Sequence, residues 1–90
     1  MGSKTSTGDF DLNTYTTEFF AICPENNIRV HYKWRVETDT VLKVEDLIDE
    51  VNLHSRGYHE EIADQLQRSF GGKQNLTAFH HGVLIETTRS

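Results

Sequence analysis

Residues 19–34 of the chain read FFAICPENNIRVHYKW. The second half of this stretch alternates between apolar and polar residues, and the apolar set is Ile28, Val30, Tyr32, Trp34 and Val36. A period of two predicts a β-strand with one buried face, because successive side chains point to opposite sides of a sheet. The first half ends in Cys23 and Pro24, followed by Glu-Asn-Asn, which is typical of a turn. We therefore expect two strands joined by a tight connection, with a thiol at the bend.

The residues on either side of this stretch extend the pattern into a small sheet. Asn13–Ile22 is rich in Thr, Tyr and Phe, which favour strands, and residues 28–38 form the second strand. After two helices, residues 76–80 and 83–88 again favour strands, and Gly82 between them suits a hairpin turn.

Two amphipathic helices are predicted in the middle of the chain. The first covers residues 44–51, with an apolar stripe made of Val44, Leu47, Ile48 and Val51. The second covers residues 58–70 and stops at Gly71 and Gly72, and its stripe is Tyr58, Ile62, Ala63, Leu66 and Phe70. The predicted order is β-β-α-α-β-β, an α+β fold in which two helices cover one face of a four-stranded antiparallel sheet.

Length and charge narrow the classes of function. Ninety residues make one domain, which we place at residues 13–90, after a polar lead-in at residues 1–12 that we expect to be disordered. A net charge of −5 argues against a nucleic-acid partner. No apolar run approaches the roughly 20 residues of a membrane span, so no membrane partner is expected.

A single Cys forms no internal disulfide and fits a reducing, cytoplasmic setting. So small a core favours self-association into a homo-oligomer.

The polar face of the second strand is basic, with Arg29, His31, Lys33 and Arg35 in alternate positions. Such a row is most often a solvated face. We interpret it as the lining of a space shared between subunits, where an anionic or polar ligand would meet it. Glu86 on the last strand is expected to pair with one of these bases.

Three short motifs occur in one order along the chain. They are FFAICP at residues 19–24, GYHEE at residues 57–61 and FHHGVLI at residues 79–85. Together they resemble the tunnelling fold (T-fold) of purine- and pterin-handling enzymes, and in particular the nitrile oxidoreductase family of queuosine biosynthesis, which reduces 7-cyano-7-deazaguanine. The family's Phe-x-x-x-Cys-Pro resembles FFAICP, and its Phe-His-Glu resembles the Tyr-His-Glu of GYHEE.

The resemblance implies a role for each site residue. Cys23 would add to the nitrile as a covalent thioimide, with His59 as its catalytic partner. Glu60 would anchor the purine-like ring through paired hydrogen bonds, and Phe20 and Arg29 would also contact the substrate. The family assembles into barrels with sites between subunits, which implies that Glu60 of one chain works beside Cys23 of another.

Two positions depart from the family. Its general acid, seven residues after the Cys, corresponds to Val30 here. Its NADPH-contacting segment corresponds to residues 42–46, LKVED, which does not match. NADPH is therefore not assigned as a cofactor.

Other readings of the same residues stay open. Cys23 is equally well a small buried hydrophobe, and Glu60 is also an ordinary carboxylate at a helix start. His31, His59, His80 and His81 are all candidates to activate Cys23. Type-B GTP cyclohydrolases also carry a Cys-Pro, with a Cys and a His near a metal, but no ligand spacing here is typical of a zinc site, so no metal ligand is assigned. The chain is thus a nitrile-processing enzyme, a purine- or pterin-binding or assembly protein without turnover, or a metal-assisted cyclohydrolase.

Overall fold

A computed structural model describes residues 11–90, so most of the expected lead-in lies outside the described residues. The elements are β1 (Asn13–Ile22), β2 (Arg29–Thr38), α1 (Val44–Leu53), α2 (His59–Phe70), β3 (Lys73–His80) and β4 (Val83–Arg89). The predicted β-β-α-α-β-β order is confirmed. β3 begins three residues earlier than expected, at Lys73.

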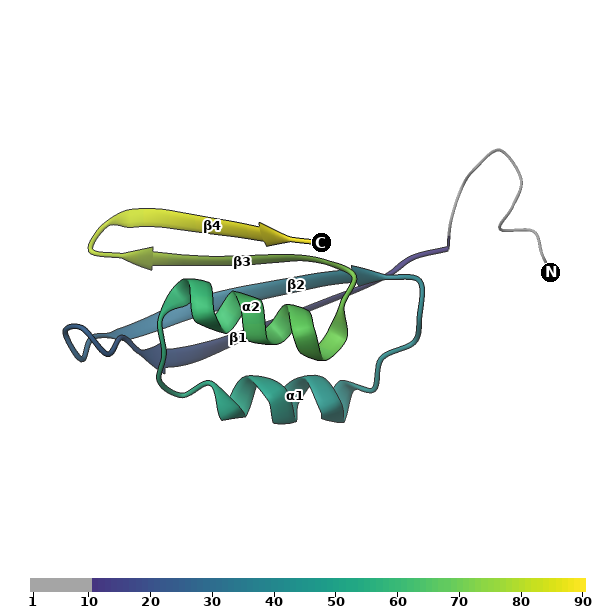
Figure 1. Ribbon diagram of the computed structural model, residues 1–90, viewed down its shortest axis with the longest axis horizontal. Coiled ribbons are helices and arrows are strands. Elements are labelled where there is room, and N and C mark those ends of the chain that lie inside the picture. The colour runs from purple at the N-terminus through teal and green to yellow at the C-terminus, as the bar shows by residue number, and fades with distance from the viewer. Residues whose placement is uncertain (1–10) are drawn as a thin grey trace.

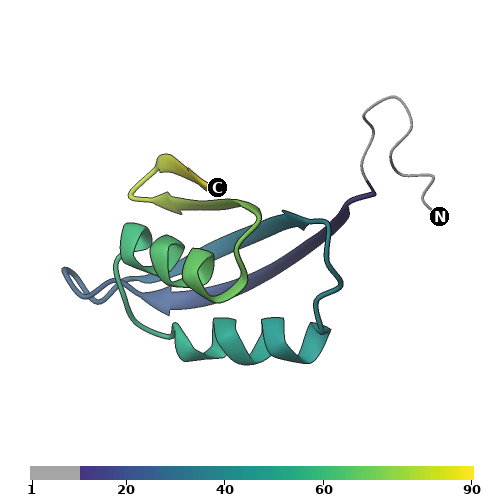
Figure 2. The same cartoon turned by 45° about the vertical axis from the view of Figure 1, so that its right-hand side comes forward.

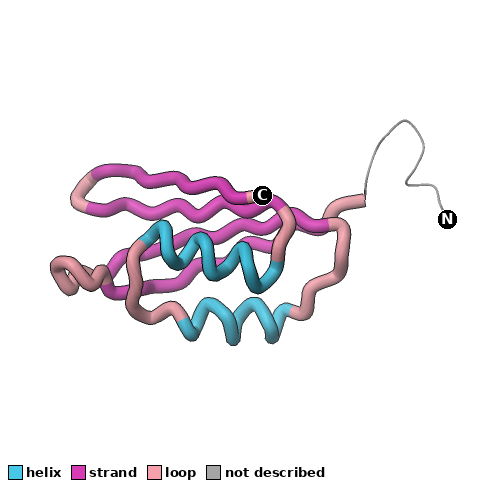
Figure 3. Tube along the Cα trace, in the orientation of Figure 1, coloured by secondary structure: helices cyan, strands magenta, loops and turns pink. Residues whose placement is uncertain are grey.

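The four strands form one antiparallel sheet in the order β1-β2-β3-β4. Figures 1 and 2 show that both helices lie on the same side of this sheet, and Figure 3 shows them as one layer packed on the strands. α1 lies along the β1 side of the sheet, while α2 lies nearer β3 and β4. The helix pair therefore joins β2 to its neighbour β3 and covers one sheet face.

The alternation in β2 sets the buried face as predicted. Val30, Tyr32, Trp34 and Val36 are all buried against the helices. Ile28 differs, because it lies in the turn before β2 and is 40% exposed. It was wrongly placed on the buried face, since alternation along the chain does not tell where pairing begins.

The helices bury less of their apolar stripes than expected. In α1, Leu47 and Val51 are buried, whereas Val44 and Ile48 are 56% and 46% exposed. α1 packs beside the edge strand β1, so half of its stripe has no sheet to cover. In α2, Ile62, Ala63 and Leu66 are buried as predicted, and Phe70 is partly buried against the core. Tyr58 precedes the helix and is exposed rather than part of its buried stripe.

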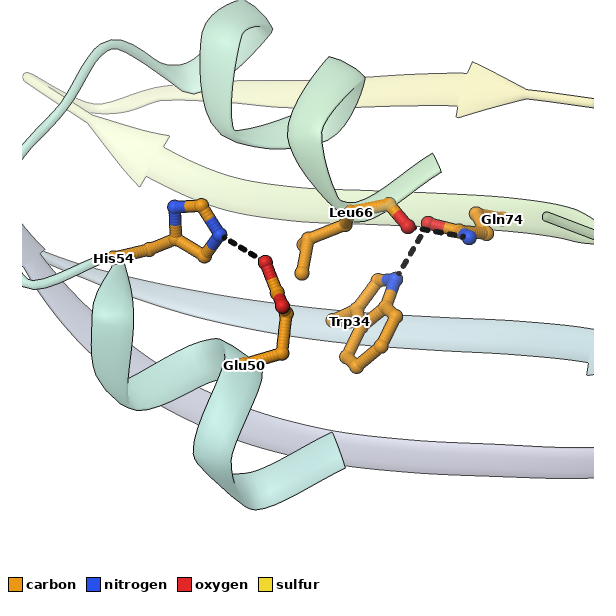
Figure 4. Close-up of polar contacts among 5 residues, drawn as sticks. All are labelled: Trp34, Glu50, His54, Leu66 and Gln74. Atoms are coloured by element: carbon orange, nitrogen blue, oxygen red, sulfur yellow. Dashed lines mark hydrogen bonds and ion pairs between the residues drawn. The ribbon is translucent and has the colours of Figure 1, made fainter. Parts of the chain in front are cut away.

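A buried polar group ties the end of α2 to the sheet. Trp34 donates its Nε1–H to Oε1 of Gln74 at 3.0 Å, and Gln74 Nε2 donates to the carbonyl oxygens of Leu66 at 3.1 Å and Gly71 at 2.7 Å. Figure 4 shows the link from Trp34 through Gln74 to Leu66, and also the Glu50–His54 pair at the end of α1, 2.9 Å apart. Each polar atom of the Gln74 amide is thereby satisfied inside the core, which limits the cost of burying it.

The connection after α2 contains two glycines with positive φ, and they differ in the space around them. A Cβ at Gly71 (φ 66°) would meet nothing within 4 Å, whereas one at Gly72 (φ 69°) would lie 2.5 Å from the carbonyl oxygen of Glu37. We expect Gly71→Ala to lower the free energy of unfolding by about 1–3 kcal/mol, because its backbone conformation (φ 66°, ψ −152°) is essentially restricted to glycine. Gly72→Ala should cost clearly more, because β2 must also shift. Urea unfolding of both variants checks this, and equal losses would contradict it.

The other sheet face carries the basic row, as predicted, with Arg29, His31, Lys33 and Arg35 all exposed. Two of these residues have acidic partners, His31 with Glu18 and Arg35 with Glu37, each at 2.7 Å. Glu86 instead accepts a hydrogen bond from Asn75 Nδ2 at 3.1 Å. The predicted pairing of Glu86 with a base is therefore wrong, because a nearer amide on β3 takes its carboxylate.

Candidate functional site

Cys23 is held at the base of the turn between β1 and β2. Its backbone N–H donates to the Ile28 carbonyl at 2.9 Å, and its own carbonyl accepts from the Asn27 N–H at 2.8 Å. Asn26 Oδ1 accepts from the Ile28 N–H at 3.1 Å, and Asn27 takes the positive φ (60°) that Asn tolerates. The thiol is free and buried, so the turn fixes it at the end of the core.

The loop between α1 and α2 brings a second motif to Cys23. The Ile22 N–H donates to the Ser55 carbonyl at 2.8 Å, and the Gly57 N–H donates to the Ile22 carbonyl at 3.1 Å. These bonds form a parallel bridge between Ile22 and Arg56. The start of α2 follows directly, so Tyr58, His59 and Glu60 are placed at the end of β1.

A cavity lies between these segments, with about 430 Å³ of empty space including its open mouth. Its walls come from the ends of β1, β2, β3 and β4 and from the start of α2. They are Cys23, Val30, Tyr32, Gly57, Tyr58, His59, Glu60, Ala78, His80 and Ile85.

His59 has the features of a base in this cavity. It is buried, and its Nε2 lies 3.2 Å from the Leu76 carbonyl oxygen, which only accepts, so Nε2 carries the proton. Nδ1 is then an unprotonated nitrogen, buried and without a hydrogen-bond partner among residues 11–90. Burial lowers the pKa of His59 below its usual range, which keeps the imidazole neutral at pH 7.

Tyr32 forms the floor of the cavity as a neutral hydroxyl. Burial, together with the negative charges of Cys23 and Glu60, raises the pKa of Tyr32 to about 12. Its ring stacks on Phe19 at 5.2 Å and lies 5.3 Å from His59, centroid to centroid. Glu60 is exposed, yet its charge reaches Tyr32, so this carboxylate lies at the rim rather than away from the cavity.

Two further contacts close the site on the turn side. The Tyr58 hydroxyl donates to Glu25 Oε1 at 3.4 Å, and the neighbouring Glu25 carboxylate raises the pKa of Tyr58. The Arg56 guanidinium donates to Asn27 Oδ1 at 2.9 Å. Both contacts join the segment before α2 to the turn that holds Cys23.

The structure thus brings together three of the five predicted site residues. Cys23, His59 and Glu60 line one cavity of a single chain, so Glu60 need not come from another subunit, as the resemblance had implied. Phe20 and Arg29 lie on the opposite sheet face, where the Arg29 guanidinium carbon sits 3.9 Å from the centroid of the Phe20 ring. Neither lines the cavity.

Tyr32 and Ile85 were not predicted as site residues. Tyr32 was placed only on the buried face of its strand, and Ile85 only in the closing hairpin. Nothing in either pattern indicates which buried residues border a cavity.

The two adjacent histidines of the closing hairpin have different surroundings, although their rings meet edge to face with centroids 4.6 Å apart. His81 and Gly82 form a two-residue turn with positive φ (55° and 81°), as a tight hairpin requires. His80 lines the cavity, while His81 is exposed and its Nε2 lies 3.0 Å from Asn26 Nδ2. Within residues 11–90, no group of three or more His, Cys, Asp or Glu residues is arranged to hold a metal ion.

The lowered pKa of His59 predicts a pH effect on stability. Below its ordinary pKa of 6.5 the unfolded chain takes up a proton that the folded chain resists, so the free energy of unfolding falls as the pH drops. We expect wild type to lose more stability than His59→Gln between pH 7.5 and pH 5.5. Urea unfolding of both proteins at the two pH values measures this difference. Identical losses would show that His59 carries no lowered pKa.

Comparison with known proteins places the fold. No protein-family model matches the chain, and no curated protein matches it in sequence. Among solved structures, the chain is similar to the archaeosine synthase QueF-Like in its apo form, at 18% identity and a TM-score of 0.66, over 87% of this chain and 90% of that one. This likeness shows a shared fold, and the predicted T-fold architecture of one chain is consistent with it.

In the described part of the chain, neither helix is long and apolar enough to cross a membrane.

Proposed function

We propose that the protein is an enzyme that binds a 7-deazapurine nitrile of the 7-cyano-7-deazaguanine type and adds Cys23 to it as a covalent thioimide. One observation carries this proposal. Residues from two sequence motifs far apart in the chain, Cys23 and the pair His59-Glu60, line a single cavity. The shared fold with an archaeosine synthase supports the same class of substrate.

The chemistry needs three groups, and the cavity supplies each. His59 Nδ1 is a neutral base able to take the thiol proton of Cys23. The first turn of α2 lies at the cavity, and its positive dipole end favours negative charge there. Glu60 at the rim accepts two hydrogen bonds from the ring N–H and amino group of a guanine-like edge.

The addition is balanced without a cofactor. The Cys23 sulfur bonds to the nitrile carbon, one carbon–nitrogen π bond breaks, and the nitrogen ends with one proton. No atom leaves, so the adduct carries the whole mass of the nitrile. The fate of the thioimide, whether reduction or attack by an amine, depends on a second reactant.

The test is intact-protein mass spectrometry after incubation with 7-cyano-7-deazaguanine, and in parallel with 7-deazaguanine, which has the same ring without the nitrile. We expect a mass increase equal to the nitrile in the first sample and no covalent change in the second. An unchanged mass in both would refute covalent chemistry.

A second function is favoured by Val30, an apolar wall of the cavity where the resembled family has its acid. In this second function, the protein binds the 7-deazapurine ring but catalyses no reaction. Calorimetric binding of both ligands with equal affinity and no adduct would establish this binding protein.

A further inference from the structure

A second imidazole in the cavity has no role in the scheme above. His80 lines the cavity from the end of β3, and its Nε2 is buried without a hydrogen-bond partner among residues 11–90. An unpaired buried nitrogen is costly, so such groups call for a partner. A polar group of a bound ligand is the partner that this position offers.

The pleat of the sheet puts His80 on the same face as Val30, the apolar residue in the wall of the cavity. β2 and β3 pair antiparallel with Tyr32 opposite Ala78, and both strands continue two residues further in the direction of Val30 and His80. The pleat repeats every two residues, so Val30 and His80 continue the face of Tyr32 and Ala78, and both line the cavity. Val30 has no proton to donate, whereas the imidazole of His80 can donate one.

The proposed reaction, on which this inference rests, removes one proton from the thiol and adds one to the nitrile nitrogen. His59 is the acceptor, because its Nε2–H is engaged with the Leu76 carbonyl and its Nδ1 is free. One imidazole can carry the proton from the sulfur to the nitrogen in two steps, but a second unpaired imidazole at the same cavity can donate its own proton as the nitrogen becomes basic. Two titratable groups in different surroundings are the usual way in which a site separates these roles.

We infer that His80 is the general acid of the site and protonates the nitrile nitrogen as Cys23 adds to the carbon. The electron pair of the broken π bond moves to that nitrogen, which takes the proton from Nε2 of the His80 imidazolium and leaves a neutral imidazole. The thiol proton of Cys23 goes to His59. Exchange with water then returns both imidazoles to their starting states.

The experiment compares His80→Gln with His81→Gln as a matched control, because His81 is adjacent but exposed and outside the cavity. The rate of adduct formation with 7-cyano-7-deazaguanine is followed by intact mass. General acids contribute roughly 10²–10⁴-fold, so we expect His80→Gln to slow the adduct at least 100-fold and His81→Gln to change it less than threefold.

Alkylation of Cys23 by iodoacetamide separates this role from a structural one. That reaction needs the thiolate but no acid, so His80→Gln should alkylate within threefold of wild type. A variant that alkylates as slowly as it forms the adduct would have lost the thiolate or the fold, and this result would overturn the inference. In His80→Ala, added imidazole should restore adduct formation in proportion to its concentration, and failure to restore it would also count against a proton-donating role.

Two outcomes separate the failure of this inference from failure of the proposed function. If wild type forms the adduct and His80→Gln forms it equally fast, His80 is not the acid and the function stands. A loss seen in Tyr32→Phe instead would assign the proton to the phenol. If wild type forms no adduct, the function falls, and this inference with it.

Discussion

Cys23→Ala is expected to abolish the covalent adduct while leaving affinity for the ring within a few-fold of wild type. The substitution removes the sulfur and little else from a side chain already buried at the end of the core. Loss of a catalytic nucleophile costs roughly 10⁶-fold in rate, which places any residual reaction below detection. Time-resolved intact mass measures the adduct, and calorimetry with 7-deazaguanine measures ring binding.

Two controls guard this result. Iodoacetamide must label wild type and not Cys23→Ala, since the chain has a single Cys. Circular dichroism must show the variant folded. An adduct that persisted in folded Cys23→Ala would locate the nucleophile on another residue and remove the basis of the proposed function.

The second large effect concerns recognition of the ring. Glu60→Gln is expected to weaken binding of 7-deazaguanine by roughly 10- to 150-fold, because hydrogen bonds to a charged group contribute about 1.5–3 kcal/mol. The amide keeps the shape of Glu60 but offers one acceptor oxygen where the carboxylate offers two. Isothermal calorimetry on both proteins gives the ratio of dissociation constants.

Glu61→Gln is the matched control, because Glu61 is the next residue of α2, carries the same charge and does not line the cavity. Its affinity should stay within threefold of wild type. Equal losses in both variants would indicate a general field effect of the acidic first turn, and no loss in Glu60→Gln would leave the ring edge without its proposed acceptor.

Local sequence patterns were enough to predict most of the fold. Alternation in β2 identified four of its five buried residues. Gly71 marked the end of α2, and His81-Gly82 marked the turn of the last hairpin. These signals are short-range, because pleat and turn chemistry act within a few residues. The exposure of Ile28, Val44 and Ile48 depends instead on how far neighbouring elements extend, which no local pattern contains.

Sequence motifs identified three of the residues that line the cavity, but they did not show how the separate segments come together. Cys23, His59 and Glu60 were found by motif, whereas Phe20 and Arg29 lie on the other side of the sheet. The docking of the α1–α2 loop on Ile22 depends on two backbone hydrogen bonds, which carry no side-chain signature. His80 was one of four candidate histidines, and what distinguishes it from His81 is that β3 and the cavity lining include His80, whereas His81 lies in the turn.

The loop between α1 and α2 also holds the two sides of the cavity together. The bonds joining Ile22 to Ser55 and Gly57 lie at the end of an edge strand, so they can break while the rest of the sheet stays intact. Each such opening would carry the start of α2 away from Cys23 and disassemble the cavity. Hydrogen exchange of the Ile22 and Gly57 amides would report these openings together, and a ligand held by both Cys23 and Glu60 would slow the exchange of both amides at once.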